Sequence, residues 1–287
     1  MKFGVSASGV DPHRIAEFAV AAENLGFESV WMPEHIVMPT VVKSTIPHAS
    51  ANLDMSSAAF LPMLDPFITL AHIATATSSV RLGSCVALLA LRDPFLAARS
   101  VASLDLLSGG RASVGVGAGW CTEEYELMGI DPSSRGRRLD ETLEIMTLLF
   151  TEHTTEYQGK IFTFGPVAFE PKPIQKPRPP LLVGGNSAAA LRRAARLGDG
   201  WIGVAMGPDQ ARDAVQDLSR QREGYGRDDA FEVSMRVEME LLPSVVEAFE
   251  RSGVERLILR GLRMELRAGT DEAFDHIAQV AEQVGLG

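Results

Sequence analysis

Residues that would mark the chain as secreted or membrane-bound are scarce or missing. Only two cysteines, Cys85 and Cys121, occur among 287 residues, too few for a disulfide framework. The first residues lack the apolar segment of a secretory signal, and no apolar run approaches the length needed to cross a bilayer. We therefore expect a cytoplasmic protein without a membrane partner.

Basic residues are in the minority. The 27 lysines and arginines are outnumbered by 37 aspartates and glutamates, which gives a formal net charge of -10. Nucleic acids and anionic membranes bind through an excess of basic side chains, so we expect neither as a partner and favour a small-molecule substrate. No spacing of histidines and cysteines resembles a metal site, so no metal is predicted.

Short apolar runs alternate with amphipathic helical patterns along the whole chain, without a linker or low-complexity tract. The runs predict strands over residues 2–6, 28–32, 80–86, 111–116, 180–183, 200–204, 232–241 and 256–260. The patterns predict helices near residues 11–25, 66–78, 93–107, 134–150, 187–197, 208–223, 243–252 and 270–284. Eight strand–helix units in a chain of this length are typical of a closed (β/α)8 TIM barrel. The sequence thus predicts a single α/β domain over residues 1–287.

Three connections are longer than the usual few residues. Residues 36–64 and 121–133 follow strands two and four, at the end of the barrel where ligands bind. The first of them is a candidate lid, in which Phe60 and Leu61 could cover an apolar substrate, although a dimer contact would explain it equally well. Residues 152–179 precede strand five, contain a hairpin-like segment, and are expected at the opposite mouth or along the side of the barrel.

Glu34 and His35 end strand two in the string ESVWMPEH. A histidine beside a carboxylate suits proton transfer or the anchoring of a polar ring edge. The alternative is a rim histidine held in a loop hydrogen bond. The position at the carboxyl end of a barrel strand favours a functional role.

Two glycine-rich turns follow strands four and five, GVGAG at residues 115–119 and Gly184-Gly185 before Asn186 and Ser187. Turns of this kind let backbone N–H groups reach a phosphate, and the second begins a helix. Rossmann and methyltransferase loops normally occupy the first strand–helix unit and expect an acid about 20 residues later. Here the cluster follows the fourth strand and that region is helical, so the barrel interpretation is favoured. An ordinary strand-to-helix turn remains possible for the second site.

In six ordered blocks the chain resembles the bacterial luciferase-like family and, within it, the coenzyme F420-dependent oxidoreductases. The blocks are AVAAENLGFESVWMPEH (19–35), RLGSCVALLALRDP (81–94), LDLLSGGRASVGVGAGW (104–120), RGRRLDETLEIMTLLF (135–150), PPLLVGGNSAAALRRAARLGDGWI (179–202) and GVERLIL (253–259). The resemblance implies a (β/α)8 barrel with a deazaflavin or flavin lying across its mouth.

The resemblance also implies roles for particular residues. Cys85-Val86 matches a position where the family has a non-proline cis peptide behind the cofactor ring, and Ala87 follows it. His35, with Glu34, matches the residues near the reacting carbon. The phosphate-binding loops correspond to Gly117, Ala118, Gly119 and Trp120, and to Val183, Gly184, Gly185 and Asn186.

Trp120 departs from the sugar-phosphate dehydrogenase branch of the family, which has a glutamate there. We therefore expect a small, apolar substrate. The resemblance implies that this substrate exchanges a hydride with coenzyme F420. The alternatives are a flavin mononucleotide (FMN)-dependent monooxygenase that uses O2 and a non-catalytic cofactor-binding member. Since related proteins often pair, a homodimer is expected.

Overall fold

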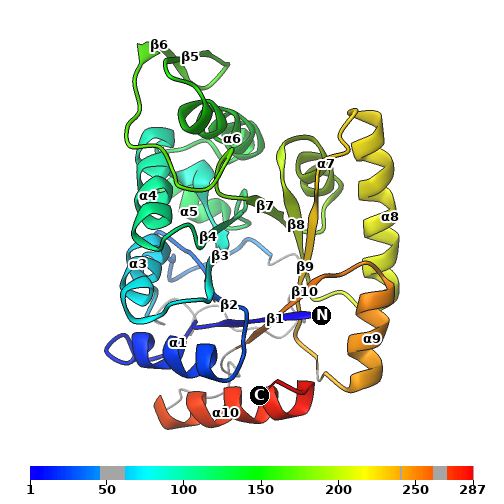
Figure 1. Cartoon of the computed structure of the whole chain (residues 1–287). Helices are drawn as coiled ribbons and strands as arrows, with labels where there is room; N and C mark the ends of the chain where they lie inside the picture. Colours follow the sequence, from blue (N-terminus) through cyan, green and yellow to red (C-terminus); the bar gives the residue numbers. More distant parts are fainter. Residues whose placement is uncertain (46–61, 240, 261–269, 287) are drawn as a thin grey trace.

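The computed structural model describes residues 1–45, 62–239, 241–260 and 270–286. Eight parallel strands close into a barrel in the order β1-β10-β9-β8-β7-β4-β3-β2 (Figure 1). Pairing of Lys2 with Arg256 closes the ring between the first and last strands. The strands are β1 (Lys2–Ser6), β2 (Ser29–Met32), β3 (Arg81–Ala87), β4 (Ala112–Val116), β7 (Leu181–Gly184), β8 (Gly200–Val204), β9 (Glu232–Arg236) and β10 (Arg256–Arg260). The predicted (β/α)8 architecture is confirmed.

One long helix follows each barrel strand and packs outside the ring (Figure 1). These are α1 (Ile15–Asn24), α3 (Pro66–Ala76), α4 (Pro94–Leu107), α6 (Arg135–Thr151), α7 (Ala188–Leu197), α8 (Pro208–Gly224), α9 (Pro243–Arg251) and α10 (Thr270–Val284). The short helix α5 (Thr122–Leu127) lies in the connection after β4. The predicted hairpin is present as the antiparallel pair β5 (Thr155–Gln158) and β6 (Thr163–Val167), beside α6 in Figure 1. Among the described residues, no helix has the length and apolarity to span a membrane.

Two predicted boundaries differ from the structure by four and five residues. The seventh predicted strand, β9, ends at Arg236 instead of residue 241, because its last pairs are those of Arg236 with Val204 of β8 and with Ile258 of β10. The first helix begins at Ile15 instead of residue 11. Asp11 forms a turn there, in which its side chain accepts the His13 N–H at 2.9 Å and its carbonyl accepts the Arg14 N–H at 2.9 Å.

The starts of α3 and α4 share the sequence Asp-Pro-Phe. Asp65 accepts the N–H groups of Phe67 and Ile68, and Asp93 accepts those of Phe95 and Leu96 in the same way. A proline at the first helical position loses no hydrogen bond, and the aspartate satisfies two of the free donors. Both helices therefore begin at a point fixed by the sequence.

The barrel interior is filled by an apolar cluster of Trp31, Leu182, Ile202 and Ile258. Trp31 is fully buried, and a Cβ on Gly83 would lie 2.2 Å from its ring. The larger core lies between the strands and the surrounding helices. The indole therefore blocks the middle of the barrel and confines ligands to its two mouths.

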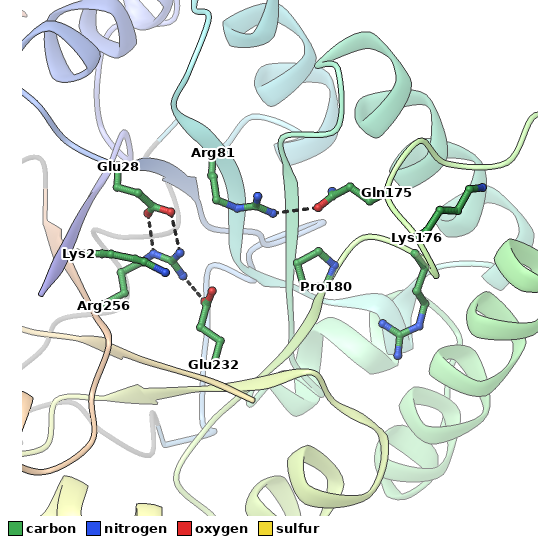
Figure 2. Close-up of a pocket in the computed structure, with 9 residues that line it drawn as sticks. Lys2, Glu28, Arg81, Gln175, Lys176, Pro180, Glu232 and Arg256 are labelled. Carbon is green, nitrogen blue, oxygen red and sulfur yellow. Dashed lines mark hydrogen bonds and ion pairs between the residues drawn. The ribbon is translucent and has the colours of Figure 1, made fainter. Parts of the chain in front are cut away.

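A charged cavity of about 440 Å³ lies at the amino-terminal mouth (Figure 2). The buried Arg256 donates through Nε to Glu28 at 2.8 Å and also pairs with Glu232. Burial raises the pKa of Glu28, but its bond with Arg256 outweighs this and holds the pKa below its usual value. Arg81 turns instead to Gln175, from the connection before β7, as Figure 2 shows. That connection thus reaches the amino-terminal mouth, a face that in barrels serves stability.

Candidate active site

Four strands carry the predicted site residues to one mouth of the barrel. β2 pairs with β3, β3 with β4, and β4 with β7, all in parallel, so their carboxyl ends lie side by side. This brings together Glu34 and His35 after β2, the end of β3, and the two glycine-rich turns after β4 and β7. The arrangement is that of the catalytic face of a barrel enzyme.

Val86 joins three of these strand ends. A Cβ on Gly117 would lie 2.6 Å from its Cγ2, and a Cβ on Gly184 would lie 2.6 Å from its Cγ1. Both glycines are therefore needed for the packing of Val86, a reason that the sequence alone did not reveal. The Cys85-Val86 peptide bond is cis, as the resemblance implies. Burial raises the pKa of the Cys85 thiol to about 11, while Arg236 slightly opposes the rise; the thiol is therefore a poor nucleophile at neutral pH.

The turn after β4 presents free backbone donors. Ala118, Gly119 and Trp120 are half-buried, and their N–H groups make no hydrogen bond to the described residues. The Tyr125 hydroxyl donates to the Ala118 carbonyl at 2.5 Å and so holds the turn in place. These donors can approach an anion at the mouth.

The turn after β7 leads into the amino terminus of α7. Gly185 has φ +114°, a conformation that residues with a Cβ rarely adopt. The Ser187 hydroxyl accepts the Ala190 N–H at 3.2 Å, while Ala188 and Ala189 lie exposed in the first turn. The first N–H groups of an α-helix have no partner within it, and they favour an anion.

Three of the predicted cofactor residues have side chains engaged elsewhere. Ala87 and Val183 are fully buried in the core between strands and helices, so neither residue exposes an atom that a ligand at the mouth could contact. The Asn186 amide donates to the Val204 carbonyl at 2.7 Å and accepts the Val204 N–H at 3.0 Å. Asn186 therefore joins the end of β7 to that of β8.

Glu34 is buried, with 5% of its surface exposed. Its Oε2 accepts a hydrogen bond from the Leu88 N–H at 2.6 Å, and its Oε1 accepts one from Nε of Arg92 at 2.9 Å. Arg92 also donates to Asp65, the N-cap of α3, at 2.5 Å. The Glu34 carboxylate thus links the end of β2 to the connection after β3 and forms no hydrogen bond with the neighbouring His35 ring.

His35 is held by a different carboxylate. Its Nδ1 lies 2.8 Å from Oε2 of Glu124, the third residue of α5, which is 1% exposed. The imidazole is also edge-on to the Trp120 indole, with ring centroids 5.8 Å apart and an interplanar angle of 83°. The histidine side chain, which is 16% exposed, is therefore fixed on two sides at the mouth.

Sequence reasoning missed Glu124 and its neighbour Glu123 as parts of the site. Glu123 accepts the N–H groups of Lys43 and Ser44 at 2.7 and 3.0 Å, so α5 holds the connection after β2 at two places. In the sequence, both carboxylates are ordinary acidic residues in a first helical turn. Residues 46–61 of the predicted lid, with Phe60 and Leu61, lie outside the described residues. No group of metal-ligating side chains occurs in the part of the chain that the structure describes.

Fold and site together place the protein among barrels that bind ligands at the carboxyl ends of their strands. Residues 1–284 match the model of the luciferase-like monooxygenase family, to which the chain belongs. It is 32% identical over 272 residues to an uncharacterized protein of Mycobacterium tuberculosis. The aligned region covers 94% of this chain and 92% of the relative.

Two solved structures share the fold over 99% of this chain and 98% of theirs. The monooxygenase RslO1 from Streptomyces bottropensis is 21% identical, with a TM-score of 0.78. An F420-dependent secondary alcohol dehydrogenase in complex with an F420-acetone adduct is 19% identical, with a TM-score of 0.76. These two structures share the fold, and the match to the family model confirms the family resemblance seen in the sequence.

Proposed function

We propose that the protein is a coenzyme F420-dependent oxidoreductase that transfers a hydride between the deazaflavin and a small, apolar organic substrate. The observation that carries this proposal is the meeting of Val86, Gly117 and Gly184 at the mouth that also holds His35 and Trp120. A rigid apolar surface with free backbone donors on either side suits a flat ring that carries a phosphate.

The residues present fit such a cofactor. The free N–H groups of the turn after β4 and those of the first turn of α7 would hold the phosphate, and Gly185 leaves the approach to α7 open. Cys85 and Val86 border the barrel interior and would lie against the ring. When bound, the deazaflavin would accept or supply the hydride.

His35 would transfer the proton, since its ring lies at the mouth and, among the described residues, forms its only hydrogen bond through Nδ1. Glu34 supports the same region through Leu88 and Arg92. Trp120 adds an aromatic surface that favours an apolar substrate and helps to exclude water.

An FMN-dependent monooxygenase that uses O2 is the second candidate. The observation in its favour is that RslO1 and the F420-dependent dehydrogenase resemble the barrel almost equally, with TM-scores of 0.78 and 0.76. Both cofactors carry a tricyclic ring and a phosphate, which the same two turns could bind.

Parallel fluorescence titrations of the purified protein with coenzyme F420 and FMN test the proposal. We expect tighter binding of F420 and substrate-dependent turnover of the bound deazaflavin. Clearly tighter binding of FMN would favour the monooxygenase, and binding without turnover across a substrate screen would indicate a non-catalytic member.

We also infer that the protein is cytoplasmic and that it pairs with a second copy of itself. Ile68 and Leu96, at corresponding positions in the first turns of α3 and α4, are 74% and 68% exposed. Apolar side chains that are exposed on neighbouring helices of one copy are typical of a surface that a second copy covers. Light scattering should give a dimer mass for the wild type and a monomer mass for the double variant I68K/L96K; a monomeric wild type would exclude pairing.

A further inference from the structure

We propose that Glu124 is a positioning residue that fixes the tautomer of His35 and leaves Nε2 as the ring nitrogen available at the mouth. This inference rests on the proposed function, in which His35 moves a proton.

The two oxygens of Glu124 have separate partners. Oε1 accepts the N–H groups of Ile36 and Val37 at 2.6 and 3.2 Å, while Oε2 lies 2.8 Å from Nδ1 of His35. Because the side chain is buried and bonded on both sides, it has no freedom to rotate. The carboxylate therefore presents an acceptor to His35 in a fixed direction.

A neutral imidazole carries its proton on one nitrogen and a lone pair on the other. An ionised carboxylate offers only acceptors, so the bond at Nδ1 requires the proton to lie there. Among the described residues, none forms a hydrogen bond with Nε2. The lone pair of the neutral ring is thus on Nε2, which can take a proton from a substrate and later return it.

The adjacent carboxylate cannot fill this role. Glu34 is occupied by the Leu88 N–H and by Arg92, so it has no oxygen directed at the ring. The orienting group comes instead from α5, 89 positions along the chain. A connection that carries no barrel strand therefore determines which ring nitrogen is protonated in a residue that follows β2.

The variant E124Q tests the assignment because glutamine has nearly the same shape. Its carbonyl oxygen must take the place of Oε1, since the opposite orientation would direct the NH2 group at two N–H donors. The NH2 group then faces Nδ1 and acts as a donor, which moves the proton of His35 to Nε2.

The readout is the ¹⁵N spectrum of histidine-labelled protein without cofactor, recorded at a pH at which imidazole is neutral, with His35 assigned through H35N. We expect the lone pair on Nε2 in the wild type and on Nδ1 in E124Q. An Nε2–H tautomer in the wild type would overturn the proposal by itself, and so would the same tautomer in both proteins.

Glu123 provides the matched control. It lies on the same helix and holds the same connection through Lys43 and Ser44, but it does not touch His35. E123Q should therefore keep the wild-type tautomer. A switch in E123Q as well would mean that both variants act through the loop, and the positioning role would be lost.

Kinetics separate this inference from the proposed function. In E124Q, kcat should fall by roughly 10²–10⁴-fold, the range for misplacing an acid–base group, while the cofactor Kd stays within about twofold. If E124Q changes the His35 tautomer but the protein does not bind F420, the proposed function is wrong and the positioning role of Glu124 stands. If wild type and E124Q turn over F420 at the same rate, the positioning role of Glu124 is wrong and the proposed function stands.

Discussion

Arg92 donates through Nε to the buried carboxylate of Glu34 at 2.9 Å. The same guanidinium contacts Asp65, so one side chain joins the end of β2, the connection after β3 and the start of α3. Burial raises the pKa of Asp65, but the bond with Arg92 and those with the first N–H groups of α3 outweigh this, so that the pKa lies below its usual value.

Replacing this arginine should strongly destabilise the barrel. R92A leaves a buried carboxylate without its partner, a change that typically costs about 3–5 kcal/mol. The control R212A removes an exposed pair with Asp209 and should cost less than about 1 kcal/mol. Urea denaturation of the three proteins measures the difference, and equal losses in the two variants would contradict the structural role of Arg92.

The contact of Val86 with Gly184 predicts a compensating pair of substitutions. G184A places a methyl group against Val86 and should cost roughly 1–3 kcal/mol through overpacking. V86A removes the obstructing methyl groups, so the double variant V86A/G184A should recover at least about 0.5 kcal/mol relative to the sum of the single changes. Thermal denaturation of all four proteins provides the cycle. Strict additivity would mean that the two side chains do not meet.

A substitution at Gly185 should weaken cofactor binding more than it destabilises the fold. With φ +114° and a place before α7, G185V should block the approach to the helix terminus and weaken F420 binding at least about tenfold. G165V, in the hairpin, meets no atom within 4 Å and serves as the control. A folded G185V protein that binds the cofactor normally would exclude this turn from the site.

His35 should affect chemistry more than affinity. H35A removes the proposed proton-transfer group, and kcat should fall by roughly 10²–10⁴-fold while the cofactor Kd changes little. Stopped-flow measurement of deazaflavin oxidation or reduction, together with the fluorescence titration, separates the two quantities. Parallel losses in both would make His35 a binding residue.

Glu23 should contribute stability that disappears in acid. Burial raises the pKa of its carboxyl group, but hydrogen bonds from Ser79, Val80 and Ser78 outweigh this and lower the pKa to about 2. Since the pKa is lower in the folded than in the unfolded state, the stabilisation is complete above the unfolded value of 4.5 and is lost as the pH falls through about 2. The melting temperature of E23Q should therefore lie below that of the wild type at pH 7 and approach it between pH 4.5 and pH 2. A constant difference across that window would refute the assignment.

The barrel was predictable because burial on both faces makes its strands short apolar runs, as in residues 80–86 and 200–204. Parallel order then places the residues after each strand at one mouth, which is why Glu34, His35 and the glycine-rich turns were found together. The cis bond at Cys85-Val86 came from the resemblance alone, because no local pattern in the sequence indicates it.

The pairing inside the site could not be predicted. His35 has a carboxylate next to it in sequence, yet it bonds to Glu124, while Glu34 turns to Arg92. Which carboxylate bonds to His35 depends on where three connections meet in space. Distance along the sequence carries no information about that. The need for glycine at 117 and 184 likewise arises from a valine on another strand.

The four hydrogen bonds that join α5 to the backbone of the connection after β2 bear on how this barrel can be redesigned. Loops of barrel enzymes are often exchanged one at a time in order to change substrate range. Here Glu123 and Glu124 hold the backbone at Lys43, Ser44, Ile36 and Val37. Replacing either connection alone would remove the hydrogen-bond partners of the other, so the two should be transferred together.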